Sequence, residues 1–203
     1  MKLVLASTSP RRRELLSRLG VEFEVEPPTV NEDRHPGEAP PEAVERLARA
    51  KATAVAGPGK IVLAADTLVV HDGRALGKPA HPEEARSMLR DLQGSSHDVF
   101  TGIAVAHWDG HAVVESMVDV AEVVFLPMTA DEIASYVATG EPMDKAGSYA
   151  LQGIAGRYVE AVHGSPFTVI GLPLHLLARL VARAGHDLEA FAVDPQSTVD
   201  SGP

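Results

Sequence analysis

The chain has 203 residues, of which 45% are hydrophobic, so it can form one large domain or two small lobes around a substantial apolar core. Its formal net charge of −10 argues against general binding of nucleic acid, which needs a basic face, but allows a local basic pocket for a small anionic substrate. The absence of cysteine excludes disulfides, zinc–thiolate sites and a cysteine nucleophile, and because no apolar run is long enough for a signal sequence or a membrane span, we expect a soluble cytoplasmic protein.

The N-terminal segment predicts a buried strand over residues 3–6, followed by a helix that ends at Gly20. Ser9 suits the N-cap of this helix. Three arginines lie in its first turn, where the helix dipole normally favours acidic side chains, within the run Ser7-Thr8-Ser9-Pro10-Arg11-Arg12-Arg13. A bound anion would remove the conflict, because backbone N–H groups, hydroxyls and guanidinium groups would all point at one phosphate. Alternatively, the arginines point into water at a small cost.

The next segments place a lysine where apolar side chains are expected. Residues 21–25 alternate and predict a half-exposed strand, and residues 27–41 form an acidic, proline-rich loop that contains Glu32. A helix is predicted over residues 41–56, with Lys51 on or near its apolar stripe. A snorkelling stem is the usual explanation for such a lysine. A buried ammonium that meets a ligand is the other.

A central strand, buried on both faces, is predicted for the continuous apolar run 61–65. It delivers Asp66 and Thr67 at its C-terminal end, which is where open α/β sheets bind their ligands. Residues 68–70 continue the strand, which leaves Asp66 inside an apolar segment, where a buried carboxylate needs a cation, a donor or a metal. A turn acid or a helix cap is the alternative, but this burial favours a catalytic carboxylate.

The rest of the chain completes an α/β pattern. Asp72-Gly73 predicts a hairpin, with Lys78 shortly after it. Strands are predicted at 99–106 and 112–125, and helices at 82–92, 129–139 and 172–184. The glycine-rich stretch 144–153, which contains Lys145 and Gln152, is typical of backbone that approaches a ligand closely. Without an internal linker, we expect one domain over residues 1–193 and a disordered tail over 194–203.

Common phosphate, zinc and serine-hydrolase motifs are absent: the sequence contains no Walker A loop, G-x-G-x-x-G, H-E-x-x-H or G-x-S-x-G. Dispersed cations and acids remain, namely Arg11, Arg12, Lys51, Lys78, Lys145, Glu32, Asp66 and Asp144. Such residues suit phosphoanhydride hydrolysis, which needs neutralised phosphate charge, a metal ion such as Mg²⁺ on one or two carboxylates, and a base for the attacking water.

The motifs, taken in order, resemble the Maf family, the septum-formation-associated nucleotide pyrophosphatases. The resemblance covers nearly the whole chain through Ser7-x-Ser9-Pro10-Arg11-Arg12, Glu32, Arg46-Leu47-Ala48-x-x-Lys51-Ala52, Ala65-Asp66-Thr67, Gly77-Lys78-Pro79, Asp144-Lys145-Ala146-Gly147-x-Tyr149-x-x-Gln152-Gly153 and Val169-x-Gly171-Leu172-Pro173. It implies a Maf/inosine-triphosphatase-like α/β fold, with a long mixed central sheet flanked by helices and a cleft between two lobes. It also implies metal-dependent hydrolysis of a nucleoside triphosphate to the monophosphate and pyrophosphate, and a homodimer.

The resemblance also implies roles for individual residues. Asp66 matches the proton acceptor of the family. Glu32 and Asp66 would hold a divalent cation, Mg²⁺ or Mn²⁺. The specificity positions match Arg11, Thr67 and Gln152, and the remaining substrate-binding residues match Ser7, Ser9, Arg12, Lys51, Lys78 and Lys145.

Within the family, the chain is similar to the branch that acts on dTTP and UTP. A physical reason supports this branch, because the amide of Gln152 can both donate to and accept from the edge of a thymine or uracil ring. Unpaired polar groups would penalise the wrong base. Two other readings stay open: a non-hydrolytic nucleotide-binding regulator of cell division, and a pyrophosphatase that prefers purine or 7-methylguanosine triphosphates.

Overall fold

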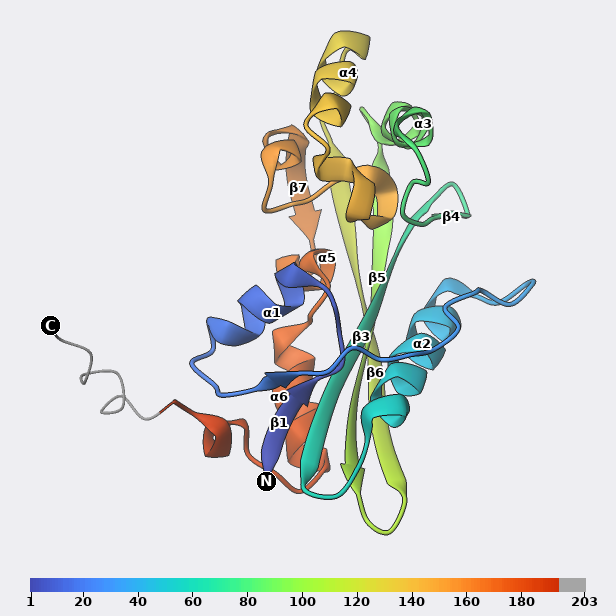
Figure 1. The fold of residues 1–203 in the computed structure, drawn as a ribbon. Coiled ribbons are helices and arrows are strands. Elements are labelled where there is room, and N and C mark those ends of the chain that lie inside the picture. Colours follow the sequence, from blue (N-terminus) through green and yellow to red (C-terminus); the bar gives the residue numbers. More distant parts are fainter. Residues whose placement is uncertain (194–203) are drawn as a thin grey trace, which may run out of the picture.

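A computed structural model describes residues 1–193, and the predicted disordered tail lies outside them. Within this range the chain forms one mixed seven-stranded sheet in the order β2-β1-β3-β5-β6-β7, with β4 paired to β3 (Figure 1). The strands are β1 (Lys2–Leu5), β2 (Glu24–Val25), β3 (Lys60–His71), β4 (Arg74–Leu76), β5 (Ser96–Trp108), β6 (Ala112–Phe125) and β7 (Val159–His163). The α/β class and the long mixed sheet are therefore confirmed.

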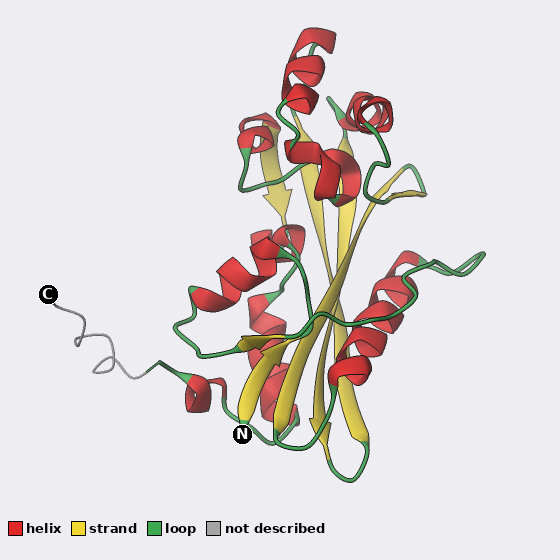
Figure 2. Ribbon diagram, viewed as in Figure 1, coloured by secondary structure: helices red, strands yellow, loops and turns green. Residues whose placement is uncertain are grey.

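Helices cover both faces of the sheet (Figure 2). They are α1 (Pro10–Ser17), α2 (Pro40–Val55), α3 (Pro82–Leu92), α4 (Ala130–Ala138), α5 (Pro166–Ile170) and α6 (Leu174–Arg183). Short 3₁₀ turns add η1 (Glu141–Asp144), η2 (Ala146–Ser148), η3 (Ile154–Tyr158) and η4 (Leu188–Phe191). The long strands β3, β5 and β6 run through the whole molecule, with α1, α2 and α6 at the lower end of Figure 1 and α3, α4 and β7 at the upper end.

The lower lobe is organised by the alternation of side chains along β3. Leu63 and its odd-numbered neighbours pack in one core cluster with Leu16 of α1 and Leu177 of α6. Val62 and Ala64 point to the opposite face, where they pack against Ala48 of α2. Because strand side chains alternate between faces, the two residues that follow in β3 also diverge. Asp66 continues the α2 face and Thr67 continues the α1 and α6 face.

The upper lobe has its own core, which lies between α3, α4 and the far ends of the long strands. Helix α4 begins with the capping box of Thr129 and Glu132, in which each side chain accepts from the backbone N–H of the other. The hairpin at residues 72–73 is also confirmed, since Asp72 and Gly73 both have positive φ, as its tight turn requires. In the described residues, no helix is both long and apolar enough to cross a bilayer.

Three local predictions differ from the structure. The strand expected over residues 21–25 is reduced to β2, and Val21 makes only an isolated bridge with Ala192. Ser9 precedes α1 as predicted, but its hydroxyl does not cap the helix; its own N–H donates to the Ser7 hydroxyl at 3.1 Å. Helix α1 ends at Ser17 rather than at Gly20, because the N–H groups of Leu19 and Gly20 bond three residues back instead of four. The expected continuation of the strand through residues 68–70 is confirmed, so Asp66 lies inside β3.

Candidate active site

A cleft of about 720 Å³ lies between the two lobes, and all of the predicted site residues line it. They are Ser7, Ser9, Arg11, Arg12, Glu32, Lys51, Asp66, Thr67, Lys78, Lys145 and Gln152. The cleft follows a free edge of β3. Strand β1 pairs with β3 as far as Leu63, and β4 begins to pair only at Val69. Between these points the edge faces neither strand, so side chains from both faces of β3 reach the same space.

Lys51 is a buried cation on the α2 side of the cleft, with 6% of its surface exposed. Its Nζ donates at 2.7 Å to Oδ1 of Asp66 and at 2.7 Å to Oε2 of Glu32. Of the two explanations for this lysine, the snorkelling stem is wrong, since the side chain does not extend to the surface and the ammonium is buried. The ammonium compensates the charge of Asp66 and fixes its orientation.

Arg12 is the principal cation on the opposite side of β3. Its Nε donates to the carbonyl oxygen of Gly171 at 2.8 Å, its Nη2 to the hydroxyl of Thr67 at 3.1 Å, and its Nη1 to the hydroxyl of Ser7 at 3.4 Å. All three acceptors are neutral. Burial lowers the pKa of the Arg12 guanidinium below its usual value, and the charge of Asp66 acts in the opposite sense. The guanidinium stays protonated, so it is a partly desolvated positive charge that an anion would stabilise.

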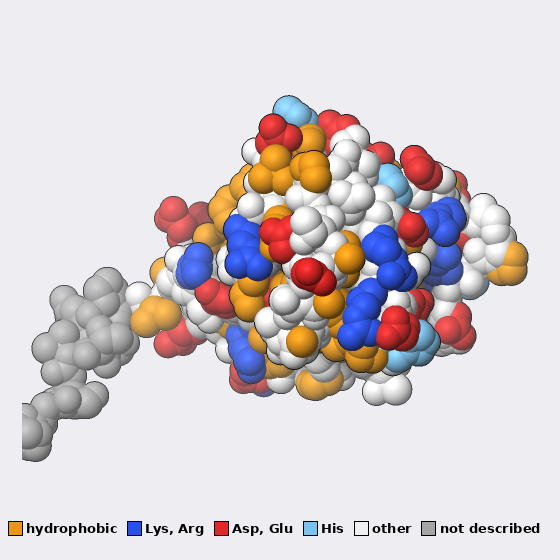
Figure 3. All heavy atoms as spheres, turned by 90° about the horizontal axis from the view of Figure 1, so that it is seen from above, with side chains coloured by type: hydrophobic (Ala, Val, Ile, Leu, Met, Phe, Trp, Pro, Cys, Tyr) orange, Lys and Arg blue, Asp and Glu red, His pale blue; other side chains and the backbone are white. Residues whose placement is uncertain are grey.

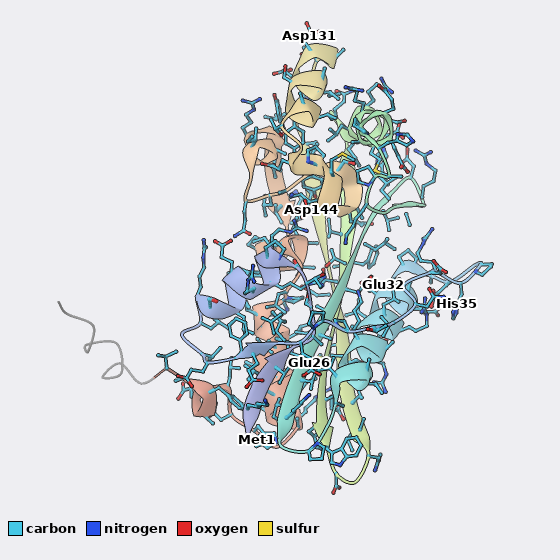
Figure 4. All side chains as sticks on the ribbon, viewed as in Figure 1. Met1, Glu26, Glu32, His35, Asp131 and Asp144 are labelled. Atoms are coloured by element: carbon cyan, nitrogen blue, oxygen red, sulfur yellow. The ribbon has the colours of Figure 1, made fainter. Side chains whose placement is uncertain are left out.

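A second pair of cations comes from both lobes. Nη1 of Arg11, at the start of α1, lies 3.4 Å from Oδ2 of Asp144, and Nζ of Lys145 lies 2.5 Å from Oδ1 of Asp144. Burial is the largest single effect on Asp144 and raises its pKa, but the hydrogen bond and charge of Lys145 and the charge of Arg11 together outweigh it, so the pKa of Asp144 is lowered. Figure 4 shows Asp144 on the upper lobe and Glu32 on the loop before α2. Seen from above, the surface mixes basic and acidic side chains (Figure 3).

The loop with Gln152 is held by Glu141, which the sequence analysis missed. The Glu141 carboxylate accepts from the Tyr136 hydroxyl at 2.8 Å and from the backbone N–H of Ile154 at 3.1 Å. Its backbone carbonyl accepts from Nζ of Lys145 at 2.6 Å. One residue therefore positions both an amide and a cation of the cleft. The only feature of the sequence that could have pointed to Glu141 was its position three residues before Asp144.

Two other contributors were not among the predicted site residues, although Arg46 belongs to a motif of the family resemblance. Arg46 donates from Nε and Nη2 to both oxygens of Glu38, and from Nη2 to the carbonyl of Asp33, which fixes the loop that carries Glu32. Thr101 lies behind Thr67 and carries the one hydroxyl in the apolar run 99–106 of β5. As an isolated polar residue in the predicted strand 99–106, Thr101 could have been recognised from the sequence as a candidate for a buried hydrogen bond.

The described residues contain no group of three His, Asp or Glu side chains that could hold a metal ion alone. The carboxylates of Glu32 and Asp66 both contact the ammonium of Lys51, so they lie close together at the cleft. Mg²⁺ is commonly bound by one or two carboxylates with phosphate oxygens and water. This donor set fits such an ion only together with a phosphate ligand.

The fold and the cleft define an α/β protein with a cationic site for a phosphorylated ligand, and sequence comparison identifies the family. Residues 2–184 match the family model described as Maf-like protein, so the chain belongs to the Maf family. It is 52% identical to the dTTP/UTP pyrophosphatase of Anaeromyxobacter sp. (strain Fw109-5), over 92% of this chain and 91% of the relative. It is 45% identical to that of Symbiobacterium thermophilum, over 92% and 96%.

Among solved structures, a HAM1 protein from Coxiella burnetii is similar with a TM-score of 0.47 and 18% sequence identity. The similarity covers 90% of this chain and 99% of that one.

Proposed function

We propose that this protein is a nucleoside triphosphate pyrophosphatase that hydrolyses dTTP and UTP to the monophosphate and pyrophosphate. The observation that carries the proposal is the combination of Arg12 and Asp66 in one cleft. Arg12 is a partly desolvated guanidinium whose hydrogen-bond acceptors are all neutral, so it is suited to bind a phosphate. Asp66 is a carboxylate oriented by Lys51 on the other face of the same strand.

The triphosphate would lie along the turn that precedes α1, with Arg12 on its phosphates and Lys78 and Lys145 around it. Asp66 takes a proton from a water molecule as the water oxygen attacks the α-phosphorus. The new P–O bond forms as the bond to the bridging oxygen of the β-phosphate breaks, and pyrophosphate leaves. Lys51 holds Asp66 in place and balances its charge.

A divalent cation, Mg²⁺ or Mn²⁺, is part of the proposal. Glu32 and Asp66 would hold it together with phosphate oxygens, and when bound it neutralises phosphate charge. Removal of the metal with EDTA should abolish pyrophosphate release, and added Mg²⁺ or Mn²⁺ should restore it. Undiminished turnover in EDTA would contradict this part.

The pyrimidine preference is supported by Gln152 and by the names of the relatives. Gln152 lines the cleft on an exposed loop, and its amide can pair with the alternating acceptors and donor of a uracil or thymine edge. The proposal also includes a homodimer, which light scattering in solution would test.

The experiment is a panel of triphosphates with the purified protein and Mg²⁺ or Mn²⁺. We expect pyrophosphate, not phosphate, to be released from dTTP and UTP faster than from CTP, purine or 7-methylguanosine triphosphates. Asp66→Asn should lower turnover by roughly 10²-fold or more, whereas Asp98→Asn, an exposed acid on β5 outside the cleft, should not. Nucleotide binding without hydrolysis would favour a regulator, and wild-type turnover by Asp66→Asn would remove Asp66 as the base.

A further inference from the structure

A buried hydroxyl lies behind the residue that holds Arg12. Thr67 accepts from Nη2 of Arg12 at 3.1 Å, and its Oγ1 lies 3.0 Å from Oγ1 of Thr101. Thr101 stands directly opposite Thr67 in the register of β3 and β5. It is fully buried and does not line the cleft, so it cannot touch a ligand bound there. Any effect of Thr101 on such a ligand must pass through Thr67.

The direction of these hydrogen bonds follows from counting protons. A hydroxyl group has one proton to donate. Thr101 donates its proton to the carbonyl oxygen of Thr168 at 2.8 Å, because a carbonyl can only accept. In the contact between the two threonines, Thr67 must therefore be the donor. The proton of Thr67 then points away from the cleft, and Thr67 presents only lone pairs to Arg12.

Helix α5 closes the arrangement from the other side. The carbonyl of Thr168 receives the proton of Thr101, and the carbonyl of Gly171, just after α5, accepts from Nε of Arg12 at 2.8 Å. Gly171 has a φ of 111°, and a Cβ there would lie 3.0 Å from Oγ1 of Thr67. Nε and Nη2 of the guanidinium are thus held by oriented acceptors, and the N–H groups that these bonds and the longer contact of Nη1 with Ser7 leave over are available to a phosphate.

We propose that Thr101 is a positioning residue for polyphosphate binding: by accepting the proton of Thr67, it keeps Thr67 an acceptor that aims the guanidinium of Arg12 at the phosphates. The proposal rests on the proposed function, since it concerns the same cleft. A phosphate oxygen is itself an acceptor, so it gains nothing from Thr67 directly. The hydroxyl chain therefore acts on the polyphosphate through Arg12.

The test uses inorganic pyrophosphate as the probe, because it has phosphates and no base. Thr101→Val removes the hydroxyl at nearly constant volume, and we expect it to raise the inhibition constant of pyrophosphate about tenfold and to lower kcat/KM for UTP and dTTP by similar factors. Thr101→Ser keeps the hydroxyl and should restore both values to within about twofold. Thr168→Val is the matched control, because it removes a neighbouring buried hydroxyl, which donates to Asp119, but leaves the backbone carbonyl that Thr101 uses.

The proposal is overturned if folded Thr101→Val binds pyrophosphate like the wild type, if Thr168→Val causes the same loss, or if only the discrimination between UTP and CTP changes. Should Thr101→Val not fold, Thr101→Cys, with a thiol that accepts weakly, must show a loss in the same direction. A wild-type protein that neither hydrolyses UTP nor binds pyrophosphate would instead refute the proposed function.

Discussion

Gly102 of β5 is the point where a single methyl group should disturb both stability and the cleft. A Cβ at this position would lie 2.5 Å from the carbonyl carbon of Val44 and 2.8 Å from the nitrogen of Glu45, with the Val44 oxygen closer still. These atoms belong to the backbone of α2, so no side-chain rotation can relieve the contact. Ordinary contacts between carbon and oxygen are about 3.3–3.6 Å. Helix α2 must therefore move away from β5 by about 1 Å in Gly102→Ala.

The cost of this movement can be estimated. Overpacking a dense interior costs about 1–3 kcal/mol, and the lower entropy of the unfolded alanine chain returns about 0.5 kcal/mol. The net cost is therefore about 0.5–2.5 kcal/mol, and because each kcal/mol lowers Tm by about 2–4 °C in a domain of this size, Gly102→Ala should lower Tm by about 1–10 °C. Because α2 carries Lys51, which contacts Asp66 at 2.7 Å, turnover should also fall. Misplacement by 1 Å can cost about 10²-fold.

The measurement pairs thermal and urea unfolding with the rate of pyrophosphate release. Gly57→Ala is the matched control, because a Cβ at Gly57 meets nothing within 4 Å and the residue does not have a positive φ. We expect it to be neutral or slightly stabilising. A Gly102→Ala protein with the Tm and turnover of the wild type would show that α2 tolerates the shift and would refute the reasoning.

The remaining predictions concern the loops on either side of the cleft. Glu141→Gln weakens the anchor of the Gln152 loop, so KM for UTP should rise several-fold with a smaller change in kcat. Gly153→Ala should have the same effect, because its Cβ would lie 2.5 Å from the Glu141 carboxyl carbon. A fall in kcat with an unchanged KM in both variants would contradict this prediction. The hydrogen bonds from Arg46 lower the pKa of Glu38 from 4.5 to about 2. A carboxyl group whose pKa is lowered in the folded state stabilises the fold fully at a pH above its ordinary pKa, and this stabilisation is lost as the pH falls toward the lowered pKa. In urea titrations, the free energy of unfolding of the wild type should therefore exceed that of Glu38→Gln by an amount that decreases from pH 4.5 toward pH 2. A difference that stays constant over this range would contradict the prediction.

The local pattern of the sequence predicted the elements well where one segment decides its own structure. The hairpin at Asp72 and Gly73 and the capping box at Thr129 depend on neighbouring residues alone, and both are confirmed. The strand over residues 21–25 failed because an edge strand gets its length from pairing, and β2 has only the short β1 beside it.

The contacts within the cleft could not be predicted in the same way. Arg12 meets Gly171 across 159 positions of sequence, and Arg11 meets Asp144 across 133. Such pairs depend on the register of the sheet and on how α5 and η1 pack, which residue spacing does not encode. The resemblance to the Maf family placed these residues in one cleft, but it did not reveal which of them hold one another. Glu141 and Thr101 were missed because they act through hydrogen bonds to other residues.

The position of the cleft follows from the alternation of side chains along β3. Asp66 and Thr67 are consecutive, so they point to opposite faces of the sheet, toward Lys51 and Arg12 respectively. Two such residues can serve one ligand only where the strand has a free edge that the ligand can straddle. Strand β1 provides this edge by stopping at Leu5 and turning into α1. The short first strand and the arginine-rich turn therefore act together: because β1 stops early, it leaves an edge of β3 open, and the turn that follows supplies cations at that edge.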